Sequence, residues 1–335
     1  MFTNPKHKKI ILSLILFSII TMICCFVVIY FRQNSNKVEL VKVKLVSALP
    51  NISAVFDGKV KEDLEKASYN VEIIPRIGQF KESIELVAQK TAMATICCHV
   101  PYINDNLDNN QNWKNIKFIH PFYLAKFGVW RQRINDPLTK DTIVDSNKNL
   151  KILIARDPSN LRLSLYILHK LSQKYSDFGK RFKLKDAIKN EAKTNSIRYH
   201  SLKIEDFDFD QEKIQILVIE QQELASNFAS QKNDECFLAI NFPALMKSNE
   251  EKVEYVPDFN LEKNEFLEDE FLNTYAISLM VHKDNENHPS INIIKESLKS
   301  REVIKWHDEN TNKNSYTIPL DKLEQITKNI KKISR

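Results

Sequence analysis

The residues best suited to bind an anion form the turn Arg156-Asp157-Pro158-Ser159-Asn160, which follows the apolar run of residues 150–155. That run has the length of a buried strand, and the residues after the turn have helical composition. Asp157 is a favoured N-cap, and Pro158 suits the first position of a helix. A helix start presents backbone N–H groups and a partial positive charge, and Arg162 would add a guanidinium one turn in. This pattern predicts a carboxylate site, although strand–turn–helix units are also ordinary crossovers in α/β proteins.

A second group of reactive side chains is Cys97-Cys98-His99. A thiolate beside a histidine can act as a nucleophile, and cysteine with histidine can bind zinc. Neighbouring strand residues point to opposite faces, so Cys98 and His99 would not both face one metal. The sequence has no second Cys/His cluster with ligand spacing. We therefore predict no catalysis, metal or cofactor here, and His99 is either a ligand contact or a turn histidine that satisfies a backbone group.

The periodicity along the chain predicts an α/β fold. Strands are expected at 41–47, 71–74, 91–98, 150–155, 214–219, 236–240 and 275–281, with helices at 53–66, 81–89 and 158–174 and further helices from 289, 301 and 320. Such alternation implies a largely parallel sheet, with ligands at the carboxyl ends of its strands. Residues 104–112 are rich in Asn and Asp and predict an exposed loop.

The amino-terminal segment, residues 1–37, contains an uncharged apolar run at 10–31, preceded by a basic cluster and followed by Arg32. The run is long enough to span a bilayer, and the basic cluster predicts that the amino end is cytoplasmic. We expect a single-pass anchor in the cell membrane, with the remainder of the chain extracellular. Lipidation at Cys24 is the alternative, but a lipoprotein cleavage site requires a small residue where Ile23 stands. The remaining alternative for this run is a buried helix of a soluble protein.

Charge and cysteine content exclude two further classes. The formal net charge is +6, and five basic and no acidic residues lie within residues 1–37, which leaves about +1 for the rest. No basic tract favours nucleic acid as a partner. Two of the five cysteines lie in the apolar run and two are adjacent, so no disulfide framework can be inferred.

Two turns, His99-Val100-Pro101-Tyr102 and Asp157-Pro158-Ser159-Asn160, resemble those of the methionine-binding lipoproteins of the NlpA type. These are extracytoplasmic substrate-binding proteins of ABC importers. The resemblance covers roughly residues 40–320 and includes Asn273-Thr274-Tyr275-Ala276 and the segment 300–306.

The resemblance implies a bilobed, periplasmic-binding-protein-like (type II) fold after the N-terminal transmembrane helix. One lobe would hold residues 38–124 plus 244–335, and the other residues 125–243. Two crossings between lobes form a hinge, and the ligand is enclosed when the lobes close.

Carrying the family pattern over residue by residue implies a set of ligand contacts. His99, Tyr102 and Asn160 belong to the two turns, Phe80 stands where the family usually has tyrosine, and Asn241 matches a polar contact. These five, with Arg162 and Arg156, form the predicted ligand-binding set.

Further positions depart from the family pattern. Cys97 replaces an aromatic residue, and Arg156 replaces an asparagine. Leu163 stands where the family has its carboxylate-binding arginine, and Arg162 precedes it by one residue, a rotation of about 100° on a helix. Arg162 is therefore either the carboxylate partner or a solvated surface residue, with Arg156 as a competitor for the role.

We interpret the chain as the substrate-binding component of an ABC importer, without enzymatic activity. The expected ligand is methionine or a related amino acid, and the expected partners are the permease and ATPase subunits. The alternative is a surface protein that keeps this scaffold but binds a different small ligand or a macromolecular partner. The departures at Cys97 and Leu163 motivate that alternative.

Overall fold

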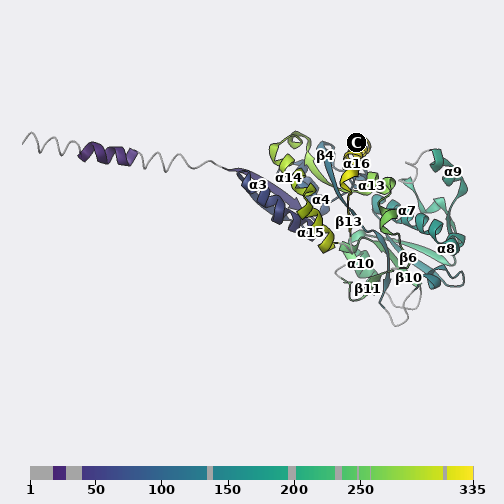
Figure 1. Cartoon of the computed structure of the whole chain (residues 1–335). Coiled ribbons are helices and arrows are strands. Elements are labelled where there is room, and N and C mark those ends of the chain that lie inside the picture. The colour runs from purple at the N-terminus through teal and green to yellow at the C-terminus, as the bar shows by residue number, and fades with distance from the viewer. Residues whose placement is uncertain are drawn as a thin grey trace, which may run out of the picture.

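The computed structural model describes residues 18–27, 40–133, 139–194, 201–230, 236–246, 249–256, 258–311 and 315–334. Its strands form two main sheets. A six-stranded sheet has the order β13-β4-β12-β3-β1-β2, and a five-stranded sheet has the order β11-β5-β10-β6-β9. In Figure 1 the helices around the first sheet lie to one side of the molecule and those around the second lie to the other.

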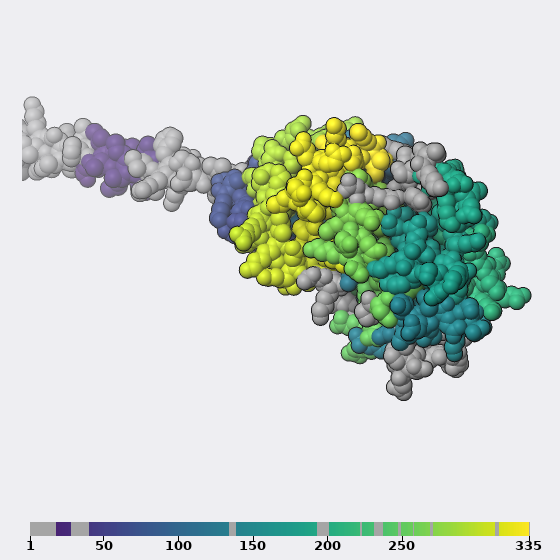
Figure 2. Space-filling model, turned by 45° about the vertical axis from the view of Figure 1, so that its right-hand side comes forward, coloured from purple at the N-terminus to yellow at the C-terminus, as the bar shows by residue number. Residues whose placement is uncertain are grey.

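The first sheet contains β1 (Val41–Ser47), β2 (Tyr69–Pro75), β3 (Ala94–Ile96), β4 (Ile116–Ala125), β12 (Ile277–His282) and β13 (Ser315–Thr317). Its helices are α2 (Pro50–Val55), α3 (Lys61–Lys66), α4 (Phe80–Ala88), α5 (Val100–Asn106), α14 (Pro289–Lys299), α15 (Arg301–Thr311) and α16 (Leu323–Ile333). Figure 2 shows the carboxyl-terminal helices in yellow on the same side of the molecule as the blue residues that open the folded domain after residue 40.

The second sheet contains β5 (Gly128–Gln132), β6 (Leu150–Ala155), β9 (Ile214–Ile219), β10 (Cys236–Asn241) and β11 (Val253–Tyr255). Its helices include α6 (Lys140–Val144), α7 (Pro158–Lys174), α8 (Ser176–Arg181), α9 (Asp186–Thr194), α10 (Gln221–Ser230) and α11 (Pro243–Met246). A small antiparallel pair, β7 (Phe182–Leu184) with β8 (Phe207–Phe209), lies apart from it. Helices α12 (Lys263–Phe266) and α13 (Asp269–Tyr275) connect the second sheet back to the first.

Both sheets are mixed, and the prediction of a largely parallel sheet was too simple. Strands β2, β1 and β3 are parallel, as are β9, β6 and β10. Antiparallel strands complete each sheet: β12 pairs with β3 and β4, and β5 pairs with β10 and β11. Strand direction depends on where the chain returns to a sheet, which periodicity within a strand does not record.

The chain passes between the sheets at two places. Strand β4 ends at Ala125 and β5 begins at Gly128, so the first crossing takes only two residues. The return crossing follows β11, because β11 pairs with β5. Residues 253–255 therefore belong to the second sheet, whereas the sequence interpretation grouped everything after residue 243 with the first lobe.

Asn260 ties the two crossings together. Its side-chain oxygen accepts a hydrogen bond from the Val129 N–H at 2.8 Å, and its amide donates to the Val129 carbonyl at 3.0 Å. Gly128 is required beside it, because a β-carbon at that position would lie 2.5 Å from Asn260 Oδ1.

The predicted transmembrane span, residues 10–31, lies mostly outside the described residues. Residues 18–27 are helical. Within the part of the chain that the structure describes, no helix has the length and apolar character to span a bilayer.

Candidate functional site

Helix α7 begins at the predicted Asp-Pro turn, and its cap is confirmed. Asp157 Oδ1 accepts hydrogen bonds from the Asn160 N–H and the Ser159 hydroxyl, both at 3.0 Å. Asp157 Oδ2 accepts a third from the Asn160 side-chain amide at 3.0 Å. The Asp157 carboxylate thus satisfies donors that a ligand anion would otherwise use and places a negative charge at the helix start.

Helix α5 begins in a similar way, with His99 as its N-cap. His99 Nδ1 accepts a hydrogen bond from the Tyr102 N–H at 3.4 Å, and the ring packs edge-on against Tyr275 at 5.3 Å between centroids. His99 is 3% exposed. Burial lowers its pKa to about 4, and the Arg162 charge acts in the same direction, so the ring is neutral at pH 7. Because Nδ1 is the acceptor, the single ring proton lies on Nε2.

The two capped helix starts meet, since α5 packs against α7. The Asn160 side chain interacts with the His99 ring in a way that raises the histidine pKa, although burial outweighs this effect. Asn160 Oδ1 is buried, and no described group forms a hydrogen bond of regular geometry with it. Three predicted residues, His99, Asn160 and Arg162, are therefore close together, with a buried acceptor among them.

Arg162 does not extend into solvent. Its guanidinium forms an ion pair with Asp105 of α5, and the two side chains are only 22% and 19% exposed. The exposed loop predicted at residues 104–112 begins only after Asn106, because α5 continues through that residue. Asp105 is thus a residue of this site that sequence reasoning missed, hidden within an Asn/Asp-rich stretch.

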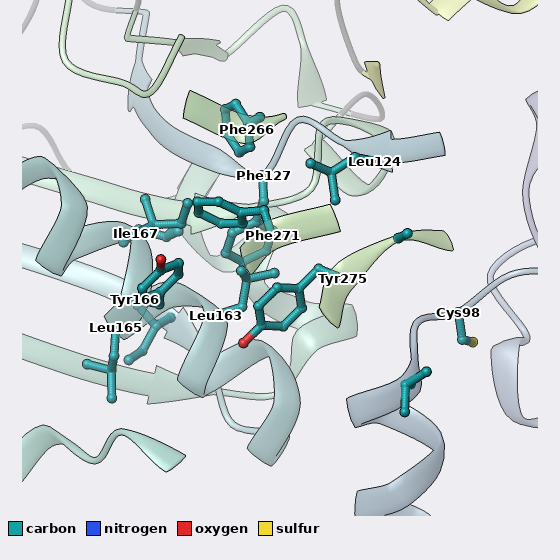
Figure 3. Close-up of a cluster of buried hydrophobic side chains, with 14 of the residues drawn as sticks. Cys98, Leu124, Phe127, Leu163, Leu165, Tyr166, Ile167, Phe266, Phe271 and Tyr275 are labelled. Atoms are coloured by element: carbon teal, nitrogen blue, oxygen red, sulfur yellow. The ribbon is translucent and has the colours of Figure 1, made fainter. Parts of the chain in front are cut away.

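Leu163, the position where the family pattern has arginine, faces the opposite way. It is 2% exposed and belongs to the largest hydrophobic cluster. Figure 3 shows it beside Phe271 and Tyr275 of α13. The helical rotation between positions 162 and 163 therefore directs the arginine towards α5 and the leucine into the core.

Tyr102 and Phe80 belong to α5 and α4, two of the helices around the first sheet. Tyr102 is partly buried and stacks on Trp113, with ring centroids 6.4 Å apart. Burial raises the pKa of its hydroxyl, and the negative charge of Asp157 acts in the same direction, which places Tyr102 near the α7 cap. Phe80 begins α4 and packs against both large hydrophobic clusters.

Two of the predicted residues are engaged elsewhere. Arg156 is exposed and pairs with Glu220 at 3.0 Å. Asn241 is fully buried at the end of β10, where its Oδ1 accepts hydrogen bonds from the Gln221 side chain and the Phe242 N–H. None of these contacts joins Arg156 or Asn241 to the group around His99.

The adjacent cysteines are not suited to nucleophilic chemistry. Cys97 and Cys98 are both buried, with their sulfur atoms 3.1 Å apart. Burial raises the pKa of the Cys98 thiol, which disfavours the thiolate that a nucleophile needs. Within the described ranges, no cluster of three His, Cys, Asp or Glu side chains could hold a metal ion.

The comparisons with known proteins concern the fold. No protein-family model matches the chain. No curated protein matches it either. A nutrient-binding protein from Burkholderia cenocepacia, solved bound to methionine, aligns with a TM-score of 0.58 at 17% identity, covering 83% of this chain and 99% of that one.

Two further solved structures agree with this one. A periplasmic substrate-binding protein of an ABC transporter from Coxiella burnetii aligns with a TM-score of 0.57 at 15% identity, over 82% of this chain and 99% of that one. A YaeC-family lipoprotein from Enterococcus faecalis has a TM-score of 0.56 at 17% identity, over 82% and 98%. The chain therefore has the fold of the ABC-transporter substrate-binding proteins and methionine-binding lipoproteins that its two turns resemble.

Proposed function

We propose that this protein is the substrate-binding component of an ABC importer and that its ligand is methionine or a related amino acid. The observation that carries the proposal is the meeting of two capped helix starts from different sheets, which gathers His99, Asn160 and Arg162. A neutral histidine, a buried amide oxygen and a guanidinium offer a donor, an acceptor and a positive charge. That combination suits a small polar ligand, and the proposal assigns no chemical step to it.

The proposal includes a bilobed architecture with one lobe built on each sheet. The short crossing at residues 126–127 and the return crossing near Asn260 form the hinge, and Asn260 holds them together through Val129. Binding between α5 and α7 would then stabilise closure, because each helix belongs to a different lobe. Phe80 and Tyr102 would form an aromatic wall of the ligand site. Asn241 and Arg156 would contact other residues of the second lobe and not the ligand.

We further propose that the domain lies outside the cell, anchored to the membrane through residues 10–31, and delivers ligand to permease and ATPase subunits. The apolar run with its basic flank supports the anchor. The lipoprotein and ABC-transporter descriptions of the proteins that share the fold support the location and the partners.

Ligand binding is expected to raise the unfolding temperature of the full-length chain. A ligand present at about one hundred times its Kd stabilises the folded state by about 2.7 kcal/mol. Thermal melts in the presence of each of the twenty amino acids at millimolar concentration measure this shift, with the D-enantiomers of the chiral amino acids as matched controls. If no L-amino acid shifts the melt, the amino-acid assignment is wrong.

Arg162→Ala is expected to abolish amino-acid binding, measured by calorimetry, because it removes the guanidinium that lies beside His99 and Asn160. Loss of a charge-assisted carboxylate contact weakens binding by about 2–5 kcal/mol. Arg156→Ala is the matched control, since its exposed pair with Glu220 lies outside the group. Unchanged affinity in Arg162→Ala, or lost affinity in Arg156→Ala, would transfer the role to Arg156.

A second candidate function is a surface protein that keeps this scaffold for a different small ligand or a macromolecular partner. The specific observation in its favour is that Arg162 already has a carboxylate partner in Asp105. A melt that responds to no small molecule, together with binding of a protein or glycan to the folded chain, would support this alternative.

A further inference from the structure

The ion pair between Asp105 and Arg162 connects two helices that follow different sheets. Asp105 lies in α5, which follows β3, and Arg162 lies in the first turns of α7, which follows β6. Each side chain is about one-fifth exposed, in contrast to the Arg156–Glu220 pair, whose side chains are 63% and 58% exposed. The partly buried Asp105–Arg162 pair is screened less by water than the exposed pair, so removing one of its partners costs more than it would at the surface.

This pair restricts which ligands can use Arg162. A ligand carboxylate that binds the guanidinium must displace Asp105 and would leave that carboxylate partly buried without a counter-charge. The penalty for such an unpaired buried charge offsets most of the gain from the new contact. A ligand that also carries an ammonium group removes the penalty, because it supplies the counter-charge that Asp105 has lost.

We propose that Asp105 is a specificity-determining residue that selects zwitterionic ligands: the Asp105–Arg162 pair opens, the ligand carboxylate binds Arg162, and the ligand ammonium binds Asp105. This inference rests on the proposed function and specifies the ligand class of the same site. The exchange replaces one ion pair by two and leaves the net charge of the site unchanged.

The surroundings support a site for an ammonium group next to Asp105 and Arg162. The buried Asn160 Oδ1 lies beside the His99 ring, and its second lone pair can accept a hydrogen bond from an N–H of the ligand. Both Asp157 oxygens already accept hydrogen bonds from Ser159 and Asn160, so Asp157 is less available than Asp105. His99 is neutral and adds no competing positive charge.

The test compares three probes on the full-length chain by calorimetry. L-Methionine carries both charged groups, 4-(methylthio)butanoate lacks the amine, and 3-(methylthio)propylamine lacks the carboxylate. The wild type is expected to bind methionine at least about tenfold more tightly than either analogue, the factor that corresponds to 1.4 kcal/mol. In Asp105→Asn, the preference for methionine over the butanoate should fall by about tenfold, and the butanoate itself should bind more tightly than it binds the wild type.

Two controls separate the possible failures. Glu220→Gln removes the same type of charge from an exposed pair and should leave all three affinities unchanged. Asp105→Glu keeps the charge and should keep the preference for methionine. Should Asp105→Asn fail to fold, the wild-type ratio of methionine to butanoate affinity decides, and a ratio below about threefold overturns the inference.

The outcomes also distinguish this inference from the proposed function. Methionine binding with the same preference in wild type and Asp105→Asn overturns the role of Asp105 and leaves the amino-acid function standing. If neither protein binds methionine or any other amino acid, the proposed function fails and the inference fails with it.

Discussion

Leu163→Arg is expected to unfold the protein or to leave it barely folded at room temperature. The variant restores the arginine of the family pattern at its own position, but Leu163 is 2% exposed and packs with Phe271 and Tyr275. An unpaired guanidinium in that cluster loses its hydration, and the leucine packing is lost as well. Such substitutions cost more than about 4 kcal/mol, a large part of the 5–15 kcal/mol that stabilises a typical domain.

Urea denaturation followed by circular dichroism measures this effect. Leu163→Met is the matched control, because it keeps the volume and apolar character and should cost less than about 1.5 kcal/mol. A cooperative transition of Leu163→Arg close to that of the wild type would show that the side chain at position 163 can turn towards α5. In that case the family register would hold and Arg162 would lose its proposed role.

The local parts of the site could be predicted from sequence because their determinants are adjacent in the chain. Asp157, Pro158 and Asn160 lie within four residues, and the cap that they form depends on no distant segment. The same holds for β6, whose apolar run predicts a buried strand. Cap chemistry and strand length are encoded locally, so this unit was predicted with nearly correct bounds.

The partners of these residues could not be predicted, because they come from distant segments. Asp105 lies 57 positions before Arg162, and nothing in the sequence around either residue indicates the pair. Tyr275, which packs against His99, was expected at the start of a strand but ends α13. Tertiary contacts of this kind depend on the order and direction of strands, which the sequence pattern gave only in part.

Acidification is expected to destabilise the protein sharply between pH 6.5 and pH 4, which is the second large effect. Five histidines are buried: His99, His120, His169, His282 and His307. Burial lowers the pKa of His282 below its ordinary value of 6.5 and lowers that of the other four to about 4. In the unfolded chain these side chains take up a proton near pH 6.5, whereas in the folded protein the other four stay neutral until about pH 4.

The sign of the effect follows from this difference. Between pH 6.5 and pH 4 the unfolded state binds more protons than the folded state, so the free energy of unfolding decreases as the pH falls. Between pH 6.5 and pH 5, each histidine lowers the free energy of unfolding by at most about 2 kcal/mol, because one unit of pKa shift corresponds to 1.36 kcal/mol. Four together approach the entire stability of a typical domain, and the loss begins well above the pH at which carboxylates become protonated.

Melting temperatures recorded from pH 7.5 to pH 4.5 at constant ionic strength measure the effect. His120→Gln is an informative variant, because His120 lies on β4 and the nearby charges of Lys299 and Lys295 also lower its pKa. Removing this titrating group should make the pH dependence of the melting temperature shallower by up to about one quarter, whatever the change in stability at pH 7. A melting temperature that stays constant from pH 7 to pH 5 would mean that these histidines take up protons in the folded state at nearly the same pH as in the unfolded chain. The packing around His99 would then be looser than its contacts with Tyr275 and Tyr102 indicate, and its neutral form could not be assumed when a ligand binds.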